Sequence, residues 1–292
     1  MKPIGKIYTP LPEKFGAPRQ SGLVEELEGK IILDSPYNVK EAFDGIEEFS
    51  HLWILWQFSD SIRDEFSPTV RPPRLGGEKR KGVFATRSPF RPNNIGLSCV
   101  KLIKVEQTKE HGTVLTVGGV DMKSGTPIYD IKPYIKYADC RPEAKSSFAD
   151  VHEADRLEIE ISDNIKSLIP SDKIDALTGI LSCDPRPAYQ NDSNRIYGIS
   201  FDNMNVKFKV DGDKLTVLEI EKAKKHLANA EKNPKINKVT YGNLSLLLRD
   251  LKNLERTYRI MLENENVTFT MNGEYYTKIA QINEKKNTNN ND

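Results

Sequence analysis

The chain is poor in the residues from which metal sites and disulfide scaffolds are built. Its 292 residues include three cysteines, Cys99, Cys140 and Cys183, which lie far apart and form no CxxC pair. Without such pairs, neither a zinc site nor a disulfide framework is expected. The four histidines show no metal-ligand spacing, so no metal is expected, and we interpret each as a surface or structural residue: His51, His111, His152 and His226.

The sequence signals of several reaction classes are also missing. There is no GxGxxG after a predicted strand, no Walker loop, no HExxH and no Ser-His-Asp order. A doubly wound nucleotide-binding fold is therefore disfavoured. The sequence shows no signal peptide and no apolar run long enough to span a membrane. Together with the scarcity of cysteine, this predicts a protein of the reducing cytoplasm.

Charge of one sign is not in excess, because 43 Lys and Arg face 42 Asp and Glu for a formal net charge of +1. Nucleic-acid binding would therefore need a local basic patch rather than bulk charge. Residues 71–81 (RPPRLGGEKRK) form one such patch. With 37% hydrophobic and 29% charged residues, the composition is that of a soluble globular protein with one large domain or two smaller ones.

Roughly the first 160 residues are predicted to be rich in β-strands, because short apolar runs alternate with turn signals. The densest run, residues 51–58 (HLWILWQF), predicts a buried strand. A Gly pair in residues 114–120 indicates a bulge or a close backbone approach. Because no βαβ alternation is present, a closed or nearly closed β-barrel fits best. A short helix is predicted at 39–43, and further strands at 5–9, 30–33, 97–104, 113–120 and 156–161.

The rest of the chain is predicted to form a small α+β domain over residues 161–220 and an extra tail over 221–292. The small domain combines two helices with a sheet that turns at Asp211-Gly212. In the tail, apolar residues at helical spacing over 243–264 predict a long amphipathic helix, followed by a hairpin and a disordered end. The predicted fold class is mainly β with α, with an N-terminal β-barrel over residues 1–160. The predicted small-domain elements are helices at 162–171 and 174–182 and strands at 196–201, 206–210 and 215–219.

Residues 82–98 (GVFATRSPFRPNNIGLS) carry the most functional information. Two prolines fix φ, Gly82 and Gly96 stand where ordinary side chains would not fit, and Arg87 and Arg91 supply positioned cations. Such a rigid, donor-rich loop suits the recognition of a phosphate or carboxylate. A solvated Pro-rich turn between two strands is the alternative interpretation.

Three other segments place polar groups on a backbone stiffened by Pro or Gly, which lowers the entropy lost on ligand binding. They are residues 15–23 (FGAPRQSGL), 121–134 (DMKSGTPIYDIKPY) and 184–189 (DPRPAY). Each also has a structural interpretation. Asp130 and Lys132 alternate with an apolar residue, as on an exposed strand face with a weak ion pair. The residues alone thus indicate a rigid β-rich protein whose polar loops converge on an anionic or zwitterionic ligand.

These strings, with FSHLWIL at 49–55 and in this order, resemble one family. It is the TrmO-like family of β-barrel tRNA methyltransferases, which act on threonylcarbamoyladenosine at position 37, beside the anticodon. The resemblance covers roughly residues 1–220. It implies S-adenosylmethionine as cofactor, tRNA and its anticodon loop as partner, methylation of the exocyclic amino nitrogen of the modified adenosine, and a homodimer. It also implies that the barrel domain binds the cofactor.

The resemblance carries over a set of site residues. The implied cofactor contacts are Pro18, Arg19, Gln20, Phe58, Ser59, Arg87, Leu97, Asp121, Met122, Lys123 and Ser124. Asp130 and Asp184 are the candidates for accepting the proton of the methylated nitrogen. Arg91, Lys132 and Arg186 are the candidates for binding tRNA phosphates or the threonine carboxylate.

Two other functions remain open at this stage. One is a non-catalytic barrel that binds a nucleotide or RNA, although such a binder would more often show a basic face with exposed aromatics. The other is a methyltransferase for another small acceptor. The tail lies outside the resemblance, and we interpret its apolar helix as a packing or dimer surface in preference to an RNA-binding appendage.

Overall fold

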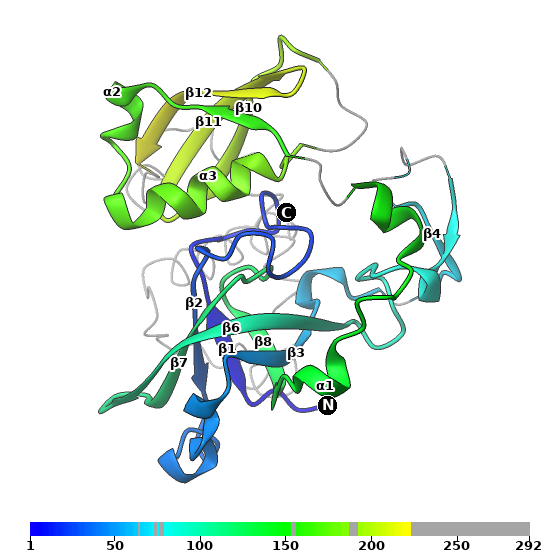
Figure 1. Cartoon of the computed structure of the whole chain (residues 1–292), viewed down its shortest axis with the longest axis vertical. Helices are drawn as coiled ribbons and strands as arrows, with labels where there is room; N and C mark the ends of the chain where they lie inside the picture. The colour runs from blue at the N-terminus through cyan, green and yellow to red at the C-terminus, as the bar shows by residue number, and fades with distance from the viewer. Residues whose placement is uncertain (64, 73–74, 76–78, 153–155, 187–191, 223–292) are drawn as a thin grey trace, which may run out of the picture. The chain divides into compact units, whose positions relative to one another are not determined.

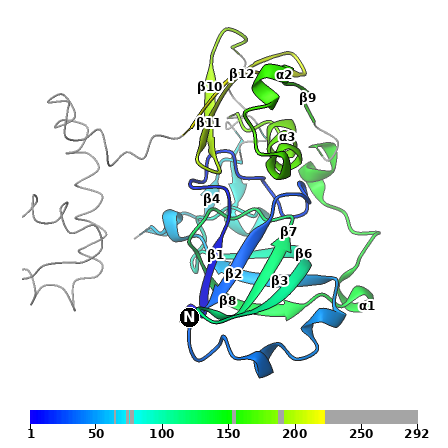
Figure 2. The same cartoon turned by 90° about the vertical axis from the view of Figure 1, so that its left-hand side faces the viewer.

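A closed barrel of six strands forms the first part of the chain (Figure 1). The computed structural model describes residues 1–63, 65–72, 75, 79–152, 156–186 and 192–222. Neighbouring barrel strands are all antiparallel, in the order β1-β2-β7-β6-β3-β8 (Figure 2). The predicted barrel and the mainly-β fold class are confirmed. The bounds are β1 Gly5–Tyr8, β2 Gly29–Leu33, β3 His51–Gln57, β6 Ile95–Thr108, β7 Gly112–Gly118 and β8 Thr126–Pro133.

Alternation of side chains along β3 builds the barrel interior. Leu52, Ile54 and Trp56 are buried, whereas the residues between them are only partly covered. Successive side chains of a strand point to opposite faces, so one face of β3 fills the core and the other lies outside. The run of residues 51–58 was predicted to be a buried strand, and the strand is present but buried on one face only.

A second, four-stranded sheet has the order β10-β11-β12-β9. The predicted strands are present as β10 (Tyr197–Phe201), β11 (Met204–Asp211) and β12 (Lys214–Lys222), and the chain reverses at residues 212–213. The strand predicted at 156–161 is β9 (Glu158–Glu160), but it pairs in parallel with β12 and does not join the barrel. Its three residues alternate between exposed and partly buried, which fits either sheet, so the pattern did not reveal its partner.

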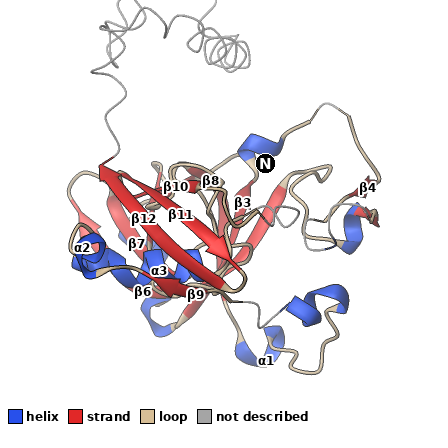
Figure 3. Cartoon of the chain, turned by 90° about the horizontal axis from the view of Figure 1, so that it is seen from above, coloured by secondary structure: helices blue, strands red, loops and turns tan. Residues whose placement is uncertain are grey.

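Helices are few and short among the described residues, as Figure 3 shows in blue. The predicted helix at 174–182 is confirmed as α3 (Ile174–Ser182), whose apolar face is buried in the core. The remaining helices are α1 (Lys136–Asp139), α2 (Asp163–Lys166) and the 3-10 turns η1 (Lys40–Phe43), η2 (Ile46–Glu48), η3 (Ser59–Ser61), η5 (Val83–Ala85), η6 (Ser147–His152) and η7 (Ser171–Lys173). A two-residue ladder joins β4 (Thr69–Val70) to β5 (Lys81–Gly82).

The loop between β1 and β2 connects the barrel to the second sheet. The Asp202 N–H donates to the Pro10 carbonyl over 2.8 Å, and buried residues of both sheets belong to one core cluster. Residues 1–224 form one compact unit. The predicted tail helix, hairpin and disordered end at 221–292 lie, from residue 223, outside the described residues. No helix of the described part is long and apolar enough to cross a membrane.

Candidate functional site

A chain of hydrogen bonds runs from the barrel interior to Asp121, in the segment between β7 and β8. Trp56 Nε1 donates to Ser98 Oγ over 2.9 Å, and the Ser98 hydroxyl donates to Asp121 Oδ1 over 2.6 Å. Ser98 is fully buried. A hydrogen bond to a charged acceptor is short and stronger than a neutral one. The carboxylate is thus held in one orientation by the barrel itself.

Burial raises the pKa of Asp121 to about 6. Several groups work against this rise and favour the charged form. They include the Ser98 hydroxyl, the backbone N–H of Ser21 and the charge of Arg87. Since Ser21 follows Arg19 and Gln20 in the chain, the carboxyl joins three segments that were picked out separately in the sequence.

Gly96 makes room for the tryptophan of this chain. Trp56 on β3 lies directly opposite Gly96 on β6. A Cβ added at position 96 would therefore lie inside the van der Waals radius of the Trp56 ring. Gly82, by contrast, would have nothing within 4 Å of an added Cβ. The prediction that a larger side chain would not fit is therefore confirmed for Gly96 and is wrong for Gly82.

Five predicted cofactor residues line one pocket at this place: Phe58, Ser59, Asp121, Met122 and Lys123. Phe58 packs on Trp56 with a centroid separation of 4.2 Å. Met122 is buried and supplies an apolar floor. Sequence reasoning missed several pocket residues, among them Lys14, Trp56, Asp60 and Thr126.

Opposite charges meet at the pocket. Lys123 Nζ lies 2.6 Å from Asp60 Oδ2, and both side chains are partly exposed. Burial lowers the pKa of Lys14, although the charge of Asp60 acts in the opposite direction. The pocket therefore offers anionic, cationic and aromatic surfaces within one small space.

Arg87 and Gln20 join the two loops that border Asp121. The Arg87 guanidinium donates to Gln20 Oε1, and the Gly22 N–H donates to the Gly119 carbonyl over 2.8 Å. Gly119 has φ of +75°, and an added Cβ there would contact the Gly22 backbone. This is the close backbone approach that the Gly pair predicted, and it brings residues 18–20 to the segment 119–124.

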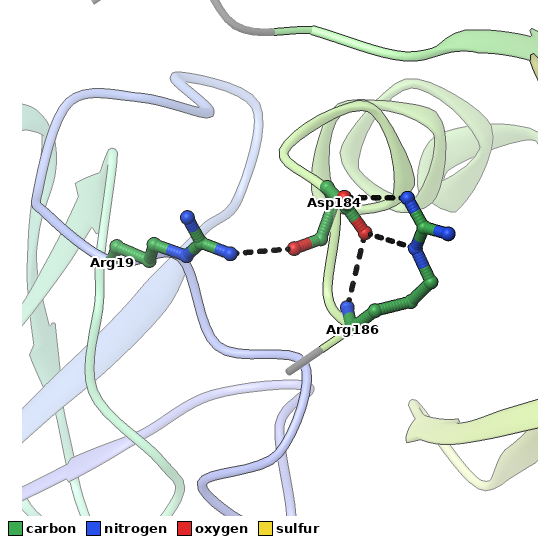
Figure 4. Close-up of polar contacts among 3 residues, drawn as sticks. All are labelled: Arg19, Asp184 and Arg186. Carbon is green, nitrogen blue, oxygen red and sulfur yellow. Dashed lines mark hydrogen bonds and ion pairs between the residues drawn. The ribbon is translucent and has the colours of Figure 1, made fainter. Parts of the chain in front are cut away.

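A second cleft contains Arg19 and Asp184, and shares Lys14 and Ala17 with the first pocket. Arg19 Nη2 donates to the Asp184 carbonyl over 3.1 Å (Figure 4). The Asp184 carboxylate accepts two bonds of 2.9 Å from the Arg186 guanidinium. The predicted proton acceptor is thus already paired with a predicted substrate cation.

Other predicted residues lie away from both cavities. Asp130 Oδ2 lies 3.0 Å from Lys132 Nζ, with both side chains about half exposed. Their strand neighbours on β3 are the outward-facing residues, so this pair occupies the outer face of the barrel. Leu97 is 55% exposed and lies on that same outer face. Neither pocket includes these three residues.

Arg91 is engaged with its own loop. Its Nη1 donates to the carbonyls of Thr86 (2.7 Å) and Val83 (3.2 Å), and its guanidinium lies 5.7 Å from the centre of the Phe84 ring. These contacts make it a support for the loop that presents Arg87. No described acidic side chain forms an ion pair with it.

One sequence signal points to the missed residue Ser98. In β6 the buried positions alternate, and Gly96, Ser98 and Val100 face inward. A hydroxyl at an inward strand position needs a buried partner, and this one has two. Trp56 carries the same signal, because its indole N–H also needs a buried acceptor.

Comparison with known proteins agrees with the fold and the loops. The model of the tRNA-methyltransferase O N-terminal domain matches residues 6–140, and that of the TrmO C-terminal domain matches residues 154–223. The tRNA (adenine(37)-N6)-methyltransferase of Escherichia coli (strain K12) is 41% identical over 226 residues, which cover 75% of this chain and 96% of the relative.

Two further likenesses come from Pseudomonas aeruginosa. A putative S-adenosylmethionine-dependent methyltransferase, RcsF, from strain PAO1 is 36% identical over 217 residues, covering 70% of this chain and 90% of the relative. A crystal structure of TrmO from this species is 31% identical with a TM-score of 0.58, over 75% of this chain and 97% of that one.

Proposed function

The chain belongs to the tRNA-methyltransferase O family, and we propose that it methylates the exocyclic amino nitrogen of threonylcarbamoyladenosine at position 37 of tRNA. It is an S-adenosylmethionine-dependent tRNA (adenine(37)-N6)-methyltransferase. The threonylcarbamoyl group on the acceptor is the part that the proposal adds. The observation that carries the site assignment is the largely desolvated carboxyl of Asp121 in a pocket lined by aromatic rings and lysines.

The pocket residues fit the chemistry of S-adenosylmethionine. That molecule combines an ammonium and a sulfonium cation with a carboxylate and an adenine ring. Asp121 offers a carboxylate for a cation, Lys14 and Lys123 offer cations for a carboxylate, and Phe58 offers a ring for stacking. When bound, the cofactor supplies a methyl group that its sulfonium already activates.

The role of the protein is then mainly to align donor and acceptor. We assign the cation contact to Asp121, because Ser98 and Ser21 fix its orientation and Arg87 favours its charged form. Pro18, Arg19 and Gln20 stand on the neighbouring loop as further cofactor contacts. The complete proposed set also contains Ser59, Leu97, Met122 and Ser124, of which Leu97 and Ser124 lie outside the pocket.

Asp184 and Asp130 remain the proposed acceptors for the proton of the methylated nitrogen. The structure favours Asp184 over Asp130 for this role. Asp184 lines the cleft next to the cofactor pocket, whereas Asp130 is paired with Lys132 on the outer face of the barrel. The pairing of Asp184 with Arg186 also supports a positioning role, in which the aspartate aims the guanidinium at the threonine carboxylate or a phosphate. Arg91 and Lys132 complete the proposed substrate contacts.

Three further proposals concern the domains, the oligomeric state and the location of the protein. We assign cofactor binding to the barrel over residues 1–160, a smaller domain to 161–220 and an added tail to 221–292. We expect the enzyme to act as a homodimer in the cytoplasm. The exposed apolar side chains of Leu97 and Ile103 on β6 support a protein contact at the outer barrel face.

The proposal is tested by incubating the protein with methyl-labelled S-adenosylmethionine and tRNA that either carries or lacks the threonylcarbamoyl group. Label is expected only in the tRNA that carries the group. Equal label in both tRNAs would contradict the acceptor assignment. Label in a different small acceptor and in neither tRNA would overturn the tRNA assignment.

A further inference from the structure

Aromatic and basic side chains gather on the exposed segment that follows the cofactor pocket. Phe84 is 72% exposed and Phe66 is 57% exposed, and their rings stack with centroids 6.4 Å apart and planes 28° apart. Two exposed phenylalanine rings that stack on each other form a contiguous apolar platform, the kind of surface that marks an interaction site. The structure describes no residue that covers this platform.

The segment of sequence that carries the platform is rich in cations. Residues 62–91 contain eight Arg and Lys and three Asp and Glu, a net charge of +5 in a chain whose total is +1. Arg91 lies against Phe84, and Arg63 lies 3.5 Å from the centre of the Phe90 ring. Local positive charge with exposed rings is complementary to a polyanion whose bases are accessible.

Hydrogen bonds hold the arginines of this segment in place. Arg80 Nε donates to Thr69 Oγ1 over 2.7 Å, beside the short β4–β5 ladder. Arg91 donates to the Val83 and Thr86 carbonyls and so fixes the turn that presents Phe84. A platform fixed before binding loses little entropy when a ligand stacks on it.

The segment that carries the platform is connected to the cofactor pocket. Lys14 lines that pocket, and its Nζ lies 6.0 Å from the centre of the Phe90 ring. Arg63, whose guanidinium lies over the same ring, follows closely on Ser59, Asp60 and Ser61, which line the pocket. Phe90 is the neighbour in the chain of Arg91, which lies over the Phe84 ring of the platform.

We infer that Phe66 and Phe84 form a stacking platform for unpaired bases of the tRNA anticodon loop, flanked by Arg63, Arg80 and Lys81 for its phosphates. The inference rests on the proposed function for the identity of the RNA. Protein–RNA recognition of single-stranded loops uses aromatic stacking of splayed bases. A double-stranded stem hides its base faces, so the loop is the part of the tRNA that such rings can bind.

The test is the affinity of fluorescein-labelled tRNA carrying threonylcarbamoyladenosine, measured by fluorescence anisotropy. Removal of a stacking ring weakens binding on the order of tenfold per ring. We therefore expect the Phe66→Ala/Phe84→Ala variant to bind on the order of 100-fold more weakly. Phe84→Trp keeps a flat ring and is expected to retain wild-type affinity. Tyr137→Ala, an exposed aromatic residue 89% accessible in α1, serves as the matched control and is expected to bind normally.

The control is a calorimetric titration of the double variant with S-adenosylmethionine. An affinity equal to that of the wild type would show that the variant is folded and that its cofactor pocket is intact. If the folded double variant binds tRNA as the wild type does, the platform assignment is wrong. If instead it changes the molecular mass in light scattering while tRNA affinity is kept, the rings form a protein contact and the assignment is likewise wrong. Loss of tRNA affinity in the double variant of a protein that transfers no methyl group would support the platform and contradict the proposed function.

Discussion

Ser98 Oγ donates to Asp121 Oδ1 over 2.6 Å, and Ser98 Oγ itself accepts the Trp56 indole N–H. This pair connects a fully buried position of β6 to a partly exposed carboxyl at the pocket. The loop residue therefore owes its orientation to the barrel interior. Each part of the chain of hydrogen bonds makes a measurable prediction.

Replacing Ser98 by Ala removes the donor to Asp121 and leaves the Trp56 N–H without an acceptor. We expect the variant to lose about 1–3 kcal/mol of unfolding free energy, the usual cost of an unsatisfied buried polar group. We also expect the pKa of Asp121 to rise further, because the Ser98 hydrogen bond lowers it. Urea unfolding and NMR titration of the carboxyl measure the two effects. A double-mutant cycle with Asp121→Asn isolates the pair, and a zero coupling energy would contradict the contact.

The raised pKa of Asp121 predicts how stability depends on pH. Its carboxyl titrates at about 6 in the folded chain and at about 3.9 when unfolded. Between these values the folded state binds more protons, so this group stabilises the fold at low pH and the stabilisation is lost as the pH rises through 6. Asp121→Asn does not titrate. Its stability relative to the wild type should therefore increase from pH 4 to pH 7, by about 1–3 kcal/mol.

The control for that measurement is Asp130→Asn, which changes a carboxyl on the outer face of the barrel. Its free energy of unfolding should stay close to that of the wild type, because exposed ion pairs contribute little. A difference between wild type and Asp121→Asn that does not change from pH 4 to pH 7 would show that the carboxyl is not desolvated.

Gly96→Ala tests the packing below the pocket. The added methyl group meets the Trp56 ring, and overpacking of this kind costs about 1–3 kcal/mol. Gly82→Ala is the matched control, because nothing lies within 4 Å of its Cβ and its φ is −57°. Thermal unfolding should separate the two variants, and equal melting temperatures would contradict the placement of the Trp56 ring.

Asp184→Ala removes both acceptors of the Arg186 guanidinium, whose side chain is only 10% exposed. We expect a loss of about 1–3 kcal/mol of stability together with weaker tRNA binding, since Arg186 is no longer aimed. Asp184→Asn keeps one acceptor and tolerates the φ of +50° at this position, so it should be milder. Methyl transfer at the wild-type rate by both Asp184→Ala and Asp130→Ala would exclude either carboxylate as the proton acceptor.

Local sequence patterns predicted most of the strands, because whether a segment forms a strand depends largely on its own residues. The apolar runs gave β1, β2, β3 and β7, and turn residues marked the reversal between β11 and β12. Which strands pair is decided by contacts distant in sequence, and for that reason β9 was expected in the wrong sheet. The alternation of exposed and partly buried residues in one short strand is compatible with the edge of either sheet.

The site was predictable to the same extent. Motifs identified Asp121, Met122 and Lys123, which do share a pocket with Phe58 and Ser59. Their partners were not predicted, because the hydroxyl of Ser98 becomes significant only when β6 places it inside the barrel beside Trp56. Asp184, which pairs with Arg186, adopts a left-handed backbone conformation, which a sequence pattern does not show.

Position-resolved methyl transfer tests the central claim most directly. Wild type and Asp121→Asn are incubated with S-adenosylmethionine and tRNA carrying threonylcarbamoyladenosine, and nucleoside 37 is analysed by mass spectrometry after nuclease digestion. The wild type should add one methyl group to nucleoside 37, and the folded Asp121→Asn variant should do so at least about tenfold more slowly, the effect of losing one charge-assisted contact. No methyl group at nucleoside 37 with the wild type, or an equal rate with Asp121→Asn, would contradict the account.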